Sequence, residues 1–156
     1  MQQRKLGRTG IEVSLLGFGC GAVGGLMVKG DAALQERAVA RALELGVTYF
    51  DTASQYGDGE SERNLGRVLK ALRPAVTVGT KVRLPPTEPG RIGGAIAASL
   101  EASLRRLQRD SVDLFQFHNA ITGADRGGEF AADTVLGEVV PAFERLRDAG
   151  KIRFFG

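Results

Sequence analysis

Residues 47–59 read VTYFDTASQYGDG. The segment starts as an apolar run with β-branched and aromatic residues, which is typical of a buried strand, and it ends in small, turn-forming residues. Asp51 closes the run and Tyr56 follows in the turn. A strand end and a turn therefore bring together a carboxylate and a phenol, two groups that take part in proton transfer.

Two other strand-like runs also end in a polar residue. AVTVGTK ends in Lys81, and SVDLFQFH ends in His118, the only histidine of the chain. Helical patterns separate these runs, and such alternation predicts an α/β fold with a parallel sheet and right-handed crossovers. Because α/β folds form their sites at the carboxyl ends of parallel strands, we expect Asp51, Tyr56, Lys81 and His118 to share one site.

The alternation of side chains along a strand indicates which residues share a face. Lys81 lies on the same face as Thr77 and Gly79, and His118 lies on the same face as Gln116. The valines and phenylalanines between them occupy the opposite faces, which suit packing against helices. The polar groups are therefore expected to project away from the helix layer.

The four residue types suggest an acid–base arrangement. A lysine at a buried strand end needs an anion, and Asp51 is the obvious partner. An ammonium group stabilises phenolate over phenol, so Tyr56 beside Lys81 could serve as a general acid. His118 could donate a hydrogen bond to the same substrate oxygen. For each residue taken alone, a structural role such as a turn cap or a solvated strand end is the favoured interpretation. Their joint placement favours the site.

The remaining chain predicts a regular series of elements. A hairpin is expected over residues 1–13, a strand over 13–18, a glycine-rich loop, and a helix that begins after the N-cap Asp31 and ends at Gly46. Further helices are expected over 61–72 and from Ile92 to Leu107, and a final strand over 151–155. Thr134 is a candidate cap for a fourth helix, in which Pro141 would either cause a kink or lie in the first turn.

Composition indicates one soluble globular domain over residues 1–156, with 43% hydrophobic and 25% charged residues. The net charge of +3 comes with dispersed arginines, which indicate solvated faces and not a nucleic-acid surface. No leading segment resembles a signal peptide or membrane span, and the single Cys20 cannot form an internal disulfide. A cytoplasmic location and no metal site are the resulting expectations.

A second motif suggests a different fold. Gly19, Gly21 and Gly24 form GxGxxG, the dinucleotide fingerprint of the doubly wound fold. In that fold the third glycine opens a helix, whereas here the helix is expected only after Asp31. Asp51 also lies beyond the usual separation of about 20 residues. This interpretation is therefore disfavoured.

The sequence resembles the aldo-keto reductases along its whole length. The matching segments are KLGRTGIEVSLLGFG, DTASQYGDGESERNLG, GTK, FHN and GKIRFFG. The resemblance implies a (β/α)8 TIM-barrel fold in which Tyr56 is the general acid, Lys81 and Asp51 tune it, and His118 orients the carbonyl of a small-molecule substrate.

The resemblance also implies a cofactor. NADPH would supply the hydride that reduces an aldehyde or ketone to an alcohol, and Gly21, Ala22 and Asp51 would lie against it. The YGDGESE segment is similar to the branch that includes potassium-channel β subunits and bacterial aldo/keto reductases. That similarity leaves open a regulatory binding role without catalysis.

Length departs from the resemblance. A complete barrel of this type takes about 250 residues, whereas the 156 residues here account for four strand–helix units and one further strand. We expect an incomplete N-terminal half-barrel of about five parallel strands, a fragment with little activity alone. The alternative is a half-barrel that self-associates through its open sheet edges.

Overall fold

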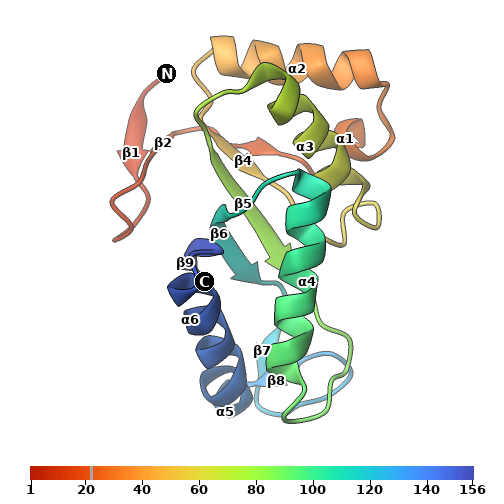
Figure 1. The fold of residues 1–156 in the computed structure, drawn as a ribbon, viewed down its shortest axis with the longest axis vertical. Helices are drawn as coiled ribbons and strands as arrows, with labels where there is room; N and C mark the ends of the chain where they lie inside the picture. Colours follow the sequence, from red (N-terminus) through yellow and green to blue (C-terminus); the bar gives the residue numbers. More distant parts are fainter. Residues whose placement is uncertain (22) are drawn as a thin grey trace.

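A five-stranded parallel sheet forms the centre of the structure, a computed structural model that describes residues 1–21 and 23–156. Its strands follow the chain without any reversal of order (Figure 1). Consecutive parallel pairing is typical of a (β/α) barrel, because each right-handed crossover adds the next strand at the same edge. The strands are β3 (Phe18–Gly19), β4 (Tyr49–Asp51), β5 (Thr77–Val82), β6 (Val112–Phe117) and β9 (Ile152–Phe155).

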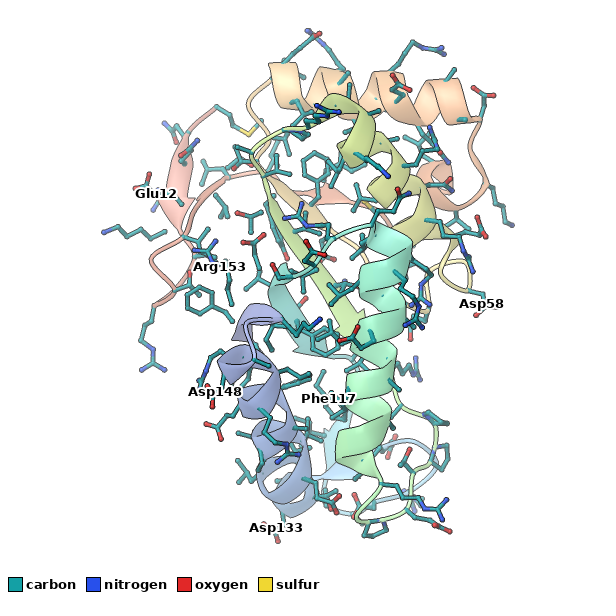
Figure 2. All side chains as sticks on the ribbon, viewed as in Figure 1. Glu12, Asp58, Phe117, Asp133, Asp148 and Arg153 are labelled. Carbon is teal, nitrogen blue, oxygen red and sulfur yellow. The ribbon has the colours of Figure 1, made fainter. Side chains whose placement is uncertain are left out.

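Helices connect the strands and pack against one another in chain order (Figure 1). They are α1 (Leu26–Lys29), α2 (Ala32–Glu44), α3 (Glu60–Leu72), α4 (Ile92–Leu107), α5 (Ala132–Thr134), the π-helical η1 (Val135–Val139) and α6 (Val140–Asp148). The core lies between this helix layer and the sheet. Side chains fill that space, whereas Asp58 and Asp148 point away from the body of the molecule (Figure 2). The largest buried core side chains include Phe50, Phe115, Phe143, Leu65, Ile96 and Leu100.

The predicted N-terminal hairpin is confirmed. Strand β1 (Gln3–Lys5) pairs antiparallel with β2 (Glu12–Ser14), and Gly7 and Gly10 adopt positive φ angles of 52° and 73° in the turn. The expected continuous strand over 13–18 is wrong, because β2 ends at Ser14 and β3 begins only at Phe18. The Ser14 backbone and hydroxyl bond reciprocally to Thr48, each at 2.9 Å, and this anchor interrupts the strand.

The predicted helices after the glycine-rich loop and before His118 are confirmed. The Asp31 side chain caps α2 by accepting hydrogen bonds from Ala33 N and Leu34 N, at 2.9 and 3.0 Å. The short α1 within the loop was not predicted. All five apolar positions of the stripe predicted for α4 are buried against the core: Ile92, Ile96, Leu100, Leu104 and Leu107.

The segment after His118 differs from expectation. Two short strands, β7 (Ile121–Thr122) and β8 (Phe130–Ala131), lie in the long loop. The Thr134 side chain does not cap a helix: helical residues begin earlier, at Ala132, and the Thr134 hydroxyl donates to the Asp125 carboxylate at 2.7 Å. Pro141 lies in the first turn of α6, which is one of the two expected arrangements, and a π-helical segment directly precedes this helix. Proline lacks the N–H that an α-helical turn requires, which is consistent with the altered pattern.

Candidate functional site

The three predicted strand-end residues lie on neighbouring strands. Asp51 is the last residue of β4, Lys81 is the second-to-last residue of β5, and His118 directly follows β6. Because these strands are parallel and adjacent, their carboxyl ends meet at one edge of the sheet. The structure therefore brings the three side chains together, as their positions in the sequence predicted.

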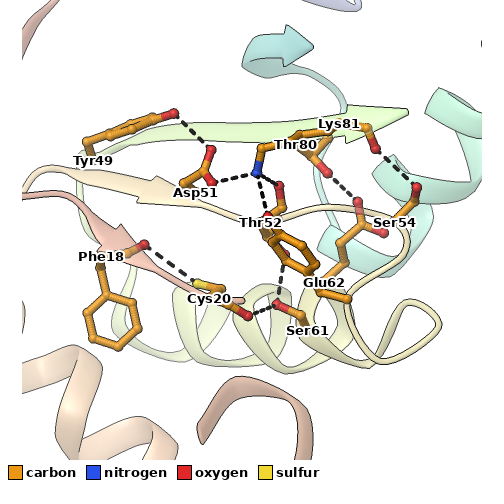
Figure 3. Close-up of polar contacts among 11 residues, drawn as sticks. Phe18, Cys20, Tyr49, Asp51, Thr52, Ser54, Ser61, Glu62, Thr80 and Lys81 are labelled. Carbon is orange, nitrogen blue, oxygen red and sulfur yellow. Dashed lines mark hydrogen bonds and ion pairs between the residues drawn. The ribbon is translucent and has the colours of Figure 1, made fainter. Parts of the chain in front are cut away.

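Lys81 is the centre of the site (Figure 3). Its ammonium donates to Asp51 Oδ2 at 2.5 Å, to the Thr52 carbonyl at 2.9 Å and to the Tyr56 hydroxyl at 3.3 Å. Only 10% of the Lys81 side chain is exposed, and these partners offset the cost of burying its charge. The nitrogen also lies 4.8 Å from the centre of the Tyr56 ring.

Asp51 is held from the other side by Tyr49. The Tyr49 hydroxyl donates to Asp51 Oδ1 at 3.0 Å. Burial raises the pKa of Tyr49, and the Asp51 charge raises it further, so the phenol stays protonated and continues to donate. A side chain at Gly79 would come within 2.9 Å of the Tyr49 hydroxyl, so glycine leaves the room this contact needs. The role of Tyr49 was missed, although its position two residues before Asp51 places it on the same face.

Tyr56 lies on the turn between β4 and α3. Its backbone N–H donates to Ala53 O at 3.1 Å, and its carbonyl accepts from Ser61 N at 3.2 Å. The turn continues through three consecutive residues with positive φ, Gly57, Asp58 and Gly59. These backbone bonds fix where the phenol leaves the chain, so its hydroxyl reaches Lys81.

His118 completes the cluster. Its backbone N–H donates to Val82 O at 2.8 Å, and its ring lies edge-on to the Tyr56 ring with centroids 6.1 Å apart. Burial lowers the pKa of His118, and the charges of Lys81 and Arg83 lower it further. The imidazole is therefore neutral at pH 7 and can donate one N–H. Its Nδ1 is buried and has no partner among residues 1–21 and 23–156.

Asn119 is a second residue that the sequence did not reveal. Its buried amide accepts from Leu84 N at 2.9 Å and donates to Leu84 O and Gly128 O, both at 2.8 Å. The amide thus ties the loop after β5 to the loop after β6, directly beside His118. No periodic pattern in the sequence signals these contacts, because the two bonds to Leu84 join residues 35 positions apart.

The glycine-rich loop reaches the site through Gly21. A side chain built at Gly21 would lie 3.8 Å from the Tyr56 ring, so this backbone faces the phenol. Ala22, predicted with Gly21 as a cofactor contact, lies outside the described residues. The unreversed strand order agrees with the rejection of a doubly wound nucleotide-binding fold, in which ligands bind where the order reverses.

Residues 1–21 and 23–156 contain no group of three or more histidine, cysteine, aspartate or glutamate side chains placed to hold a metal ion. Within the same residues, no helix is both long and apolar enough to cross a membrane.

Comparison with known proteins places this geometry in context. The sequence profile of the Aldo/keto reductase family matches residues 15–156. The whole chain aligns with the L-galactose dehydrogenase of Arabidopsis thaliana at 35% identity, and the alignment covers 48% of that protein. Among solved structures, the chain is similar over its full length to the holo form of an aldo-keto reductase from Bacillus halodurans, with a TM-score of 0.80 and 34% identity. The match covers 49% of the Bacillus chain.

An aldo/keto reductase from Klebsiella pneumoniae, solved in complex with NADP and acetate, matches 94% of the chain. The TM-score is 0.70, the identity is 31%, and the match spans 46% of the Klebsiella chain. The chain spans about half the length of the curated relatives it matches.

Proposed function

Because the chain belongs to the aldo/keto reductase family, we propose that it carries the proton-donating site of an NADP(H)-dependent oxidoreductase that reduces an aldehyde or ketone to an alcohol. Its fold is of the (β/α)8-barrel type, with five consecutive parallel strands present. The observation that carries the proposal is the 3.3 Å contact between the Tyr56 hydroxyl and the Lys81 ammonium.

Each residue of the cluster has a defined task in this proposal. Tyr56 donates its hydroxyl proton to the carbonyl oxygen as that oxygen gains negative charge. Lys81 stabilises the phenolate that remains, and Asp51 holds the ammonium in place at 2.5 Å. The neutral His118 ring, edge-on to Tyr56, donates a hydrogen bond that orients the carbonyl oxygen.

The cofactor would lie against the same end of the sheet. NADPH, when bound, supplies the hydride. Gly21 fits this role because its backbone faces the Tyr56 ring without an intervening side chain, and Asp51 lies next to the proton donor. We propose Gly21, Ala22 and Asp51 as cofactor contacts. The Klebsiella relative in complex with NADP supports the choice of NADP(H).

The substrate is proposed to be a small carbonyl compound. A single phenol and a neutral imidazole suit one uncharged oxygen atom better than an anionic group. L-Galactose dehydrogenase, one relative, is named for a sugar. Sugar-derived aldehydes are therefore a sensible class to include in a substrate panel. A cytoplasmic location is a further prediction, which cell fractionation would test.

The direct test uses the longest open reading frame that contains residues 1–156, compared with residues 1–156 alone. NADPH consumption is followed with a broad aldehyde such as 4-nitrobenzaldehyde. We expect the Tyr56→Phe variant to lose about 100- to 10,000-fold in kcat, the range that general acid catalysis supplies. Its thermal stability should remain close to that of the parent, because only one hydroxyl is removed. An inert parent, or a Tyr56→Phe variant with the parent's rate, would refute the proposal.

Self-association is a second candidate, because β3 and β9 each have a neighbour on only one side in the five-stranded sheet. Unpaired strand edges pair readily with another chain. Sedimentation equilibrium of residues 1–156 distinguishes the two possibilities. A monomer over the whole concentration range would exclude an assembly role for these edges.

A further inference from the structure

Glu62 is a fully buried carboxylate that the proposed proton transfer does not use. It lies in the first turn of α3 with no exposed surface. The Thr80 hydroxyl donates to Glu62 Oε1 at 2.5 Å, and Arg106 Nε donates to Oε2 at 2.6 Å. Arg106 also donates to the buried Ser103 hydroxyl at 3.1 Å. Both carboxylate oxygens are thus bonded, and three different elements meet at this one side chain.

The bond to Thr80 links Glu62 to the lysine of the site. Thr80 directly precedes Lys81 in β5, and alternation points the two side chains to opposite faces of the sheet. Thr80 bonds to Glu62 of α3, whereas Lys81 bonds to Asp51 on the other face (Figure 3). The Lys81 ammonium also donates to the Tyr56 hydroxyl. Glu62 therefore fixes the strand from the helix side, one residue before the ammonium group.

The same helix turn holds the tyrosine. Ser61 donates its N–H to the Tyr56 carbonyl at 3.2 Å, and its hydroxyl donates to Cys20 O at 2.8 Å. Gly59, the N-cap of α3, is buried against Arg106. A side chain at Gly59 would come within 2.6 Å of Arg106 Cδ. Arg106 therefore supports the end of the turn that carries Tyr56.

We infer that Glu62, with Thr80 and Arg106, is a positioning residue that sets the distance between the Tyr56 hydroxyl and the Lys81 ammonium. At one end of this network Thr80 anchors β5, and at the other end Arg106 supports the Tyr56 turn. The network therefore connects the two segments whose separation sets the distance for proton transfer. The kinetic consequence rests on the proposed reductase function. The geometric consequence does not.

A purely structural role is the alternative that the experiment must separate. Buried ion pairs are often neutral for stability when compared with apolar replacements, so burial alone does not assign a function. If the network only stabilises the fold, a variant elsewhere in the core that loses the same stability should affect the site equally. A positioning role predicts an effect specific to this network.

The first measurement uses the two tyrosines of the chain, Tyr49 and Tyr56. Both are labelled with 3-fluorotyrosine, and the ¹⁹F resonances are assigned with Tyr49→Phe. We expect Thr80→Val and Glu62→Gln to shift or broaden the Tyr56 resonance. Thr80→Ser keeps the hydroxyl, and its Tyr56 resonance should match that of the parent. Thr80→Val leaves the ion pair intact, so it serves if Glu62→Gln does not fold. An unchanged Tyr56 resonance in Thr80→Val overturns the inference.

Phe143→Leu is the matched control. Phe143 is buried in α6, where it packs on Phe115 and Phe155, away from the network. It should lower thermal stability without changing the Tyr56 resonance. A shift in Phe143→Leu equal to that in Thr80→Val would show that the effect is general destabilisation, and the inference would fail.

The second measurement is kinetic and uses the full open reading frame. Thr80→Val and Glu62→Gln are expected to lower kcat by about 10- to 100-fold with KM unchanged, the size of loss that misplaced catalytic groups produce. If the parent reduces carbonyls but both variants match Phe143→Leu, the inference is overturned. If the parent is inert, the proposed function fails, and the ¹⁹F result decides the positioning role by itself.

Discussion

The Lys81 ammonium and the Asp51 carboxylate form a 2.5 Å ion pair in which the two side chains are only 10% and 28% exposed. Removing such charges from water is unfavourable unless further hydrogen bonds satisfy them. The Thr52 carbonyl and the Tyr49 hydroxyl provide those bonds. The pair is therefore stable as a unit but sensitive to the loss of either partner.

Asp51→Asn is expected to lower the free energy of unfolding by about 3 kcal/mol, because it leaves the Lys81 charge buried without its counter-ion. Urea denaturation followed by circular dichroism measures this loss. Tyr49→Phe is the matched control, since it removes only one hydrogen bond to the carboxylate and should lower stability by about 1.5 kcal/mol.

The double variant Asp51→Asn/Lys81→Met tests the cause of that loss. Removing the buried charge together with its partner should recover part of the stability lost in Asp51→Asn. If Asp51→Asn destabilises no more than Tyr49→Phe, or if the double variant recovers nothing, the ion pair is not the source of the effect.

His118 is expected to titrate below the ordinary histidine pKa of 6.5, because burial and the charges of Lys81 and Arg83 all lower its pKa. As the chain has one histidine, a single imidazole resonance in the proton NMR spectrum reports the midpoint. Lys81→Met should raise the midpoint more than Arg83→Met, since Lys81 has the larger influence. A midpoint above 6.5 in the parent would contradict the neutral imidazole.

The same lowered pKa predicts how stability depends on pH. Between the lowered folded value and the unfolded value of about 6.5, the unfolded chain binds more protons than the folded chain. Stability therefore rises with pH in this window and falls as the pH drops below about 6.5. When the pH is lowered across this window, the urea midpoint of unfolding should fall more for the parent than for His118→Asn. An equal fall would assign the dependence to other groups.

The residues of the Lys81 cluster could be predicted because their positions depend on local rules. Strand alternation placed Lys81 on a face with Thr77 and Gly79, and parallel pairing brought its end beside Asp51. The same rules found the stripe of α4 and the cap at Asp31. Each of these features can be read from the periodicity of side chains along one element or from residues adjacent in the sequence.

Contacts between distant residues could not be predicted in the same way. Glu62 meets Arg106 across 44 positions, and Ser14 meets Thr48 across 34. A glutamate in a first helical turn is normal at the surface, so nothing in its surroundings predicts complete burial. The strand break at Ser14 has the same origin. In both cases tertiary packing determines the local structure.

Cys20 is expected to be unreactive in the folded chain. It is 1% exposed, and burial, with a smaller effect of the Asp51 charge, raises the pKa of its thiol to about 12. Because the thiolate is the reactive form, a disulfide reagent such as DTNB should label the native chain very slowly at pH 8 and rapidly in urea. Leu136→Cys in a Cys20→Ser background is the exposed control. Labelling of native Cys20 as fast as this control would show that the thiol is accessible.

Two glycines in helices should respond to alanine with opposite signs. A side chain at Gly66 in α3 would lie 2.6 Å from the carbonyl oxygens of Arg106 and Leu107, so α3 and the end of α4 must move apart. Such overpacking lowers stability by about 1–3 kcal/mol. Gly94 in α4 has open space around it, and Gly94→Ala should raise stability by about 0.5–1 kcal/mol through reduced backbone entropy.

Thermal unfolding of the two alanine variants measures both effects against the same parent. Gly66→Ala should also disturb the Arg106 guanidinium that bonds to Glu62, because the strained contact is with the backbone of Arg106 itself. Its ¹⁹F spectrum should therefore show a displaced Tyr56 resonance, whereas that of Gly94→Ala should match the parent. A Gly66→Ala chain as stable as Gly94→Ala would mean that α3 and α4 do not approach each other this closely at Gly66.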